Sequence, residues 1–274
     1  MKTPTILAAA LFVVCAAAPS SAAAGLRPHV AVYDMALRSA TSGSGLIDAR
    51  GLMEYKFADG CEGWAVESRS VLRLQYDEGP ELQSSWSFVS WEAKDGRSYR
   101  FRMQTVRNGN KVEDLSGRAS MDASGKSGNA VFVRPDGRKL ALAAGTMFPT
   151  QHVAELIAAA KTGTRQMGRV VFDGASLENP YEVSAFIAPQ KDAVNQELSG
   201  RFKLPDSPLW LMRLAFFPAT SRNAGPEFEM SVDYREDGIG GRIIQDFDEF
   251  SLLLQPSRIE LLPEPDCRYP IRRW

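Results

Sequence analysis

The sequence predicts an all-β protein, mainly antiparallel, in which about a dozen strands surround one helix. Segments that alternate apolar and polar residues fill most of the 274-residue chain, and hairpin-type dipeptides such as Asp59-Gly60 and Asp95-Gly96 separate them. Residues 145–163 instead carry apolar side chains at helical spacing. A lone amphipathic helix must bury its apolar face, and here the partner available is the face of a sheet.

The N-terminal residues have the three parts of a secretory signal peptide. Lys2 supplies the positive charge, an apolar run covers residues 6–18, and small residues follow it. The apolar run is too short for a helix that spans a membrane. We therefore expect residues 1–24 to be removed on export, residues 25–274 to form one domain, and the mature protein not to be transmembrane.

The mature chain keeps two cysteines, Cys61 and Cys267, because Cys15 lies in the signal peptide. An even pair in an exported chain predicts a disulfide, since the compartments outside the cytoplasm are oxidising. The alternative is two unpaired, buried thiols. A bridge between these positions would bring the two ends of the mature chain together, which favours one closed unit over two independent domains.

The expected strands follow one another in hairpin order. Turn dipeptides such as Asn108-Gly109 and Ser116-Gly117 divide the first half of the chain, and a polar stretch at residues 189–200 is expected to be a loop. The expected strands are Val30–Leu37, Gly51–Phe57, Gly63–Ser68, Val71–Tyr76, Trp86–Trp91, Tyr99–Gln104, Arg169–Phe172, Tyr181–Ala188, Leu209–Phe217, Phe228–Tyr234, Ile243–Leu254 and Ile259–Leu262.

The central helix has recognisable start and stop signals. Thr150, which follows a proline, is the expected N-cap, Lys161 gives a cationic last turn, and Gly163 is the expected C-cap. The apolar stripe consists of Val153, Leu156, Ile157 and Ala160. Small alanines at positions 158–160 would leave room beside the helix once it packs on the sheet.

Motifs for catalysis or metal binding are missing from the sequence. The two histidines, His29 near the mature N-terminus and His152 in the first helical turn, are too few for a zinc site when the cysteines are paired. A Gly-x-Ser-x-Gly nucleophile elbow is absent, and the acidic run at residues 246–249 lacks the spacing of a calcium loop. We expect no metal and no cofactor. A carboxylate pair for glycoside hydrolysis stays open, because distance in space defines such a pair.

Charge excludes one class of partner. The chain has 32 Lys and Arg against 33 Asp and Glu, a formal net charge of −1, and its basic cluster is confined to Arg268, Arg272 and Arg273. A nucleic-acid surface needs a broad basic stripe with stacking aromatics, so we expect no nucleic-acid partner.

Aromatic residues gather on two neighbouring expected strands. Trp86 and Phe88 lie on one strand, and Tyr99 and Phe101 lie on the next. Such residues belong either to the core or to the lining of a groove.

Four stretches, taken together, carry a family resemblance. They are Gly-Leu-Met-Glu-Tyr at 51–55 with Cys-Glu-Gly-Trp at 61–64, Gly-Thr-Met-Phe-Pro-Thr-Gln-His at 145–152 with its helix, Val-Phe-Asp-Gly at 171–174, and Glu-Leu-Leu-Pro-Glu-Pro-Asp-Cys at 260–267. They resemble the EipB-type cell-envelope-integrity proteins of alphaproteobacteria, formerly a domain of unknown function.

The resemblance implies a periplasmic protein whose antiparallel strands wind into a β-spiral, an incompletely closed barrel with a helix in its cavity. It also implies a disulfide between early and late strands, which Cys61 and Cys267 match. The resemblance gives the residues of the helix motif as candidate site residues; they are Phe148, Pro149, Thr150, His152, Leu156 and Ile157.

The resemblance further implies a role in envelope homeostasis and stress resistance without an established enzymatic activity. We therefore expect a non-enzymatic periplasmic scaffold that maintains cell envelope integrity by binding another periplasmic protein or an apolar envelope ligand. A first alternative is a carrier of lipid or lipoprotein, because a helix displaced from a curved sheet would expose an apolar groove. A second is a hydrolase with an unrecognised carboxylate pair. The sequence does not predict the oligomeric state.

Overall fold

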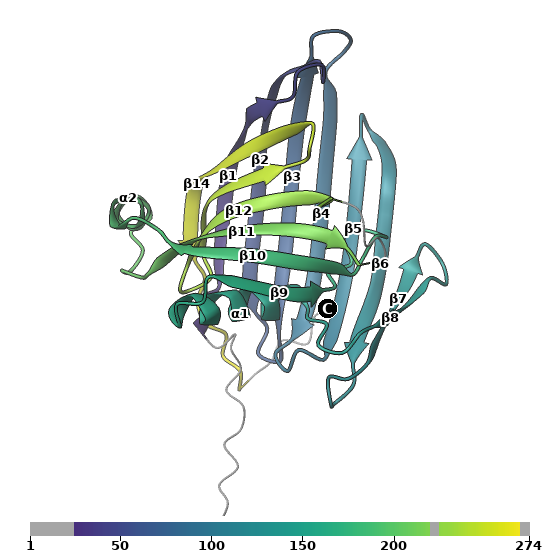
Figure 1. Cartoon of the computed structure of the whole chain (residues 1–274), viewed down its shortest axis with the longest axis vertical. Helices are drawn as coiled ribbons and strands as arrows, with labels where there is room; N and C mark the ends of the chain where they lie inside the picture. The colour runs from purple at the N-terminus through teal and green to yellow at the C-terminus, as the bar shows by residue number, and fades with distance from the viewer. Residues whose placement is uncertain (1–24, 220–224, 269–274) are drawn as a thin grey trace, which may run out of the picture.

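The computed structural model describes residues 25–219 and 225–268, and these residues form fourteen strands and two helices (Figure 1). The expected signal peptide, residues 1–24, lies outside the described residues. The strands are β1 (His29–Ala40), β2 (Leu46–Asp59), β3 (Gly63–Tyr76), β4 (Leu82–Ala93), β5 (Ser98–Arg107), β6 (Asn110–Met121), β7 (Gly128–Arg134), β8 (Lys139–Leu142), β9 (Gln166–Val171), β10 (Tyr181–Pro189), β11 (Leu209–Pro218), β12 (Phe228–Arg235), β13 (Gly240–Asp246) and β14 (Phe250–Leu261). The helices are α1 (Pro149–Lys161) and α2 (Asp192–Phe202).

All the described strands belong to one sheet with the order β8-β7-β6-β5-β4-β3-β2-β1-β14-β13-β12-β11-β10-β9. The chain winds outward from β1 to β8, passes through α1 to β9, and winds back until β14 pairs with β1. In Figure 1 the strands from β10 to β12 cross in front of β1 to β4. Because β8 and β9 are edges of the sheet and do not pair, the barrel is not closed. The expected all-β spiral is confirmed.

The disulfide between Cys61 and Cys267 is present, with the two Cα atoms 5.5 Å apart. Cys61 lies in the turn between β2 and β3, where its backbone N–H donates to Asp59 Oδ1 at 2.7 Å. Cys267 follows β14, the last strand. The bridge therefore joins an early hairpin to the segment that follows the last strand, as expected.

Helix α1 lies at one end of the spiral and packs between its two halves, which are β1 to β8 and β9 to β14. Its buried residues share a core cluster with Phe57 and Trp64 from one half and with Val183 and Met212 from the other. The expected N-cap was wrong: Phe148 occupies that position, Pro149 is the first helical residue, and Thr150 lies inside the helix. Pro at the first helical position is favourable, because its missing N–H would have no partner there.

The expected loop at residues 189–200 was also wrong, since α2 occupies most of it. This helix buries Leu198 and Ser199 and otherwise presents polar residues. Without an apolar stripe it carries no periodic signal. Its end signals are Asp192 in the first turn, Arg201 in the last, and Lys203 in the left-handed conformation as C-cap.

Several strands differ from expectation, among them the separately expected Ile259–Leu262, whose residues 259–261 belong to β14. Residues 63–76 form one strand, β3, because Arg69 and Ser70 continue the pairing with β2 and β4. Ser116-Gly117 lies inside β6 and is not a turn; it faces a bulge in β7, where Val133 is the extra residue, and a Cβ at Gly117 would lie 2.5 Å from the carbonyl oxygen of Val131. Residues 243–254 form two strands, because a turn between Asp246 and Phe250 separates β13 from β14.

Candidate functional site

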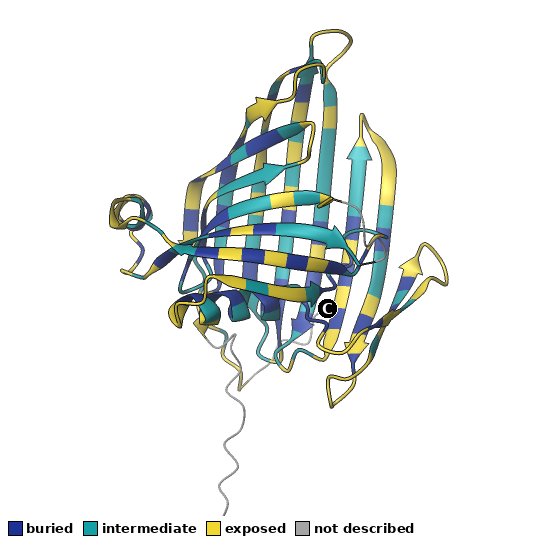
Figure 2. Cartoon of the chain, in the orientation of Figure 1, coloured by how far each residue is buried: buried dark blue, intermediate teal, exposed yellow. Residues whose placement is uncertain are grey.

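The two halves of the spiral enclose a cavity of about 680 Å³, called here the inner cavity. Every second residue of several strands points into it, as the two-residue period of a strand requires. The same period appears in Figure 2 as alternating buried and exposed bands along β10. The clearest rows are Val66, Ser68, Ser70 and Leu72 on β3, Ser84, Trp86, Phe88 and Ser90 on β4, and Phe228, Met230, Val232 and Tyr234 on β12.

Aromatic pairs form part of the wall of this cavity. The rings of Trp86 and Phe88 stack with centroids 5.6 Å apart, and those of Phe216 and Phe228 stack at 4.2 Å. Tyr181 meets Phe216 edge-on at 6.1 Å. None of the described lining residues is a lysine or an arginine. The lining therefore suits an aliphatic chain and gives no cationic partner to an anionic group.

Helix α1 forms one end of the cavity wall and is tied to β4 by Glu92. This side chain is 3% exposed, and its Oε2 and Oε1 accept the backbone N–H groups of Thr150 and Gln151 at 2.7 and 2.8 Å. The carboxylate thus satisfies donors that the helix leaves free at its N-terminus. Burial raises the pKa of Glu92 to about 7, although these hydrogen bonds oppose the rise.

His152 lies in the same first turn of α1 and also lines the cavity. Its side chain is buried, and its Nε2 has no hydrogen-bond partner. Burial, and to a lesser degree the positive charge of Arg169, lower the pKa of His152 to about 4. The imidazole is therefore neutral at neutral pH, which fits an apolar wall.

A polar corner of the cavity lies beside β10. The hydroxyl of Tyr181 donates to Glu227 Oε2 at 2.7 Å. Asp173 Oδ1 accepts the N–H of Ala175 and a side-chain N–H of Asn179, both at 2.8 Å. Burial raises the pKa of Asp173. In the described part of the chain no three potential metal ligands come together.

The structure separates the residues that sequence reasoning grouped. Trp86 and Phe88 line the inner cavity, whereas Tyr99 and Phe101 are not among its lining residues. They pack in an aromatic core, where Tyr99 stacks on Phe148 with centroids 5.0 Å apart; Phe88 also belongs to this core, and Trp86 packs against it. Of the helix motif, Pro149, Thr150, His152 and Leu156 line the inner cavity, Phe148 lies in the aromatic core, and Ile157 faces a second pocket.

The sequence analysis did not single out four residues of this site. Leu26, Tyr181 and Phe216 line the inner cavity, and Glu92 holds the helix that forms part of its wall. Glu92 had one visible signal, a carboxylate between Trp91 and Ala93 in an otherwise apolar strand end. The partner of that carboxylate is 58 residues away, and no local pattern shows it.

Comparison with known proteins agrees with this geometry. The model of a family described as EipB-like matches residues 20–263. This chain belongs to the EipB-like family. One EipB-like relative, the cell envelope integrity protein EipB of Brucella abortus (strain 2308), is 28% identical over 241 residues, which cover 86% of this chain and 84% of the relative.

A solved structure has the same EipB-like spiral. It is the crystal structure of a beta-barrel-like protein of the domain of unknown function DUF1849 from Brucella abortus, with a TM-score of 0.79 and 25% identity. The match covers 87% of this chain and 99% of that one. Neither helix in the described part of the EipB-like chain is both long and apolar enough to cross a membrane.

Proposed function

We propose that this protein is a non-enzymatic periplasmic binding protein that holds the acyl chain of an envelope lipid or lipoprotein in the inner cavity. The observation that carries the proposal is an apolar cavity of about 680 Å³ between the halves of the spiral. That volume lies within the range of small-molecule sites, roughly 300–1,000 Å³. The name of the Brucella relative supports a contribution to cell envelope integrity.

The lining explains how such a chain would be held. Each methylene that leaves water for an apolar wall contributes about 0.8 kcal/mol. Stacked rings such as Phe216 and Phe228 present flat apolar surface to it. Because the described lining has no lysine or arginine, an anionic head group would stay outside the cavity.

The non-enzymatic part of the proposal rests on chemistry and on the family. Glu92 has a raised pKa, as a catalytic acid would, but both its oxygens are engaged by the N-terminus of α1. The name of the Brucella relative describes a cellular role and not a reaction.

The test is native mass spectrometry with lipid extraction on protein purified from the periplasm without detergent. We expect a near-stoichiometric lipid or acylated peptide. An apo mass, together with no displacement of a fluorescent fatty-acid probe by lysophospholipid, would overturn the proposal.

Two neighbouring serines provide a matched pair of variants. Ser84 points into the cavity, whereas Ser85, the next residue on β4, is not among the lining residues, and both are half-buried. Ser84→Phe should reduce probe binding, and Ser85→Phe should leave it unchanged. Equal loss in both variants would mean that the cavity is not the binding site.

The scaffold interpretation remains a second candidate, because β8 and β9 end the sheet without a neighbouring strand in the described residues. An extended peptide of another periplasmic protein could add to such an edge. A cross-link from Lys139 on β8 to a second protein in the periplasm would favour this candidate.

A further inference from the structure

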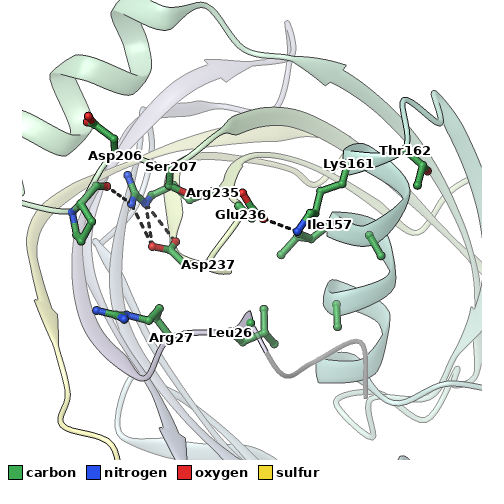
Figure 3. Close-up of a pocket in the computed structure, with 14 residues that line it drawn as sticks. Leu26, Arg27, Ile157, Lys161, Thr162, Asp206, Ser207, Arg235, Glu236 and Asp237 are labelled. Atoms are coloured by element: carbon green, nitrogen blue, oxygen red, sulfur yellow. Dashed lines mark hydrogen bonds and ion pairs between the residues drawn. The ribbon is translucent and has the colours of Figure 1, made fainter. Parts of the chain in front are cut away.

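A second pocket, of about 630 Å³, lies against the other side of α1 (Figure 3). It is called here the outer pocket, and it is formed by α1 together with residues 25–27, 205–207 and 235–237. Figure 3 shows its polar rim, where Arg235 bonds to Asp237 and Lys161 pairs with Glu236. Its apolar wall is the helix face of Ala154, Ile157 and Ala158.

Helix α1 is the common wall of the two spaces. Val153 and Leu156 face the inner cavity, and the residues next to them, Ala154 and Ile157, face the outer pocket. The small side chains of Ala154 and Ala158 leave the outer side of the helix open. Apolar surface therefore continues on both sides of one helix.

Two residues, Leu26 and Asp237, line both the inner cavity and the outer pocket, and Leu26 is the apolar one at the place where the two spaces meet. Its side chain is 8% exposed. The N–H of the next residue, Arg27, donates to the carbonyl of Asp237 at 2.8 Å and holds this segment on the turn before β13. A Cβ at Gly238 would lie 2.6 Å from Leu26 Cδ2, so the glycine is what lets Leu26 close against the turn.

We propose that Leu26 is the partition that closes the inner cavity and so determines the longest acyl chain that the protein holds. This inference rests on the proposed function. A chain that fills the inner cavity reaches the Leu26 side chain, and further methylenes then find no apolar wall. If Leu26 is shortened, the chain continues along Ala154 and Ile157 into the outer pocket.

The experiment measures the affinity of the mature protein for a series of saturated lysophosphatidylethanolamines, each two carbons longer than the last, below their micelle concentrations. Each methylene that finds apolar wall strengthens binding by up to about fourfold. In the wild type we expect affinity to stop rising at one chain length. In Leu26→Ala it should rise further, on the order of tenfold for the next member of the series.

Two other variants keep the result interpretable. Leu214→Ala removes the same volume from a buried leucine that lines the inner cavity alone, and the chain length at which affinity stops rising should not change. Leu26→Phe keeps the partition and should not lengthen the preferred chain, even if Leu26→Ala is too unstable to study.

The outcomes separate the two proposals. Leu26 is not the partition if the wild type binds the series but the affinity of Leu26→Ala stops rising at the same chain length. The same conclusion follows if Leu214→Ala changes that chain length as much as Leu26→Ala does. If the wild type binds none of the series, the proposed function itself fails, and the partition fails with it.

Discussion

The carboxylate of Glu92 lies 2.7 Å from the backbone nitrogen of Thr150, 58 residues later in the chain. This contact joins β4, in one half of the spiral, to the first turn of α1. It replaces the side-chain cap that the helix itself lacks. The position of α1 against the inner cavity thus depends on an ionisable group.

Replacing Glu92 with glutamine should change how stability depends on pH. Burial raises the pKa of Glu92 from 4.5 to about 7, so between these values the folded state binds more protons than the unfolded state. The free energy of unfolding of the wild type should therefore fall as pH rises through this window, on the order of 3 kcal/mol from this group. Glu92→Gln should lack that decline. Urea unfolding of both proteins across the window measures it.

Below this window Glu92 is protonated in the folded wild type and has one carbonyl oxygen, as a glutamine has, so the two proteins should have similar stability there. The difference between the two proteins should consequently move in favour of Glu92→Gln as pH rises. Glu178→Gln, at an exposed position, is the control. Parallel pH profiles for Glu92→Gln and wild type would show that Glu92 does not titrate in this window.

His152 should resist protonation. Burial lowers its pKa from 6.5 to about 4, so the unfolded state binds more protons between these values. The contribution to stability is complete above pH 6.5 and is lost as pH falls towards 4. NMR titration of the imidazole, assigned by comparison with His29→Gln, should show a midpoint near pH 4. A midpoint near 6.5 would mean that the ring reaches water.

Arg235→Lys should be strongly destabilising. The guanidinium is 0% exposed and donates to Asp237, to Ser199 Oγ at 2.8 Å and to the carbonyl of Pro205 at 2.6 Å. A lysine cannot reach three directions in one plane, so we expect a loss of about 3 kcal/mol in the free energy of unfolding. Arg258→Lys, where the side chain is 52% exposed, should lose less than about 1 kcal/mol. Similar losses in both variants would contradict this account of Arg235.

Features with a local cause could be predicted from the sequence. Alternation on Trp86 and Phe88 predicted a strand, and the two cysteines outside the expected signal peptide predicted the disulfide that the structure contains. Helix α1 was visible because Leu156 and its neighbours recur at helical spacing.

Features with a distant cause could not be predicted from the sequence. Thr150 looked like an N-cap because its type is right, yet Glu92 supplies the acceptor from another strand. Tyr99 and Phe101 alternate like the lining residues, but they lie in the aromatic core, where Tyr99 stacks on Phe148 and Phe101 meets Phe172 edge-on. Leu26 carries no signal, since its role depends on how closely it packs against Gly238.

Removing the disulfide should lower the melting temperature without preventing folding at low temperature. Cys61 and Cys267 are 206 residues apart, and closing so long a loop restricts the unfolded chain by at most about 5 kcal/mol. For a chain of this size we expect Cys61→Ser to melt about 10 °C lower. Cys267→Ser and the double variant should melt at the same temperature as Cys61→Ser, because each removes the same bond. Reductant should lower the melting temperature of the wild type to that value and leave the variants unchanged. Unequal single variants, or an additive double variant, would mean that the thiols stabilise the fold by packing and not through the bond between the β2–β3 turn and the segment after β14.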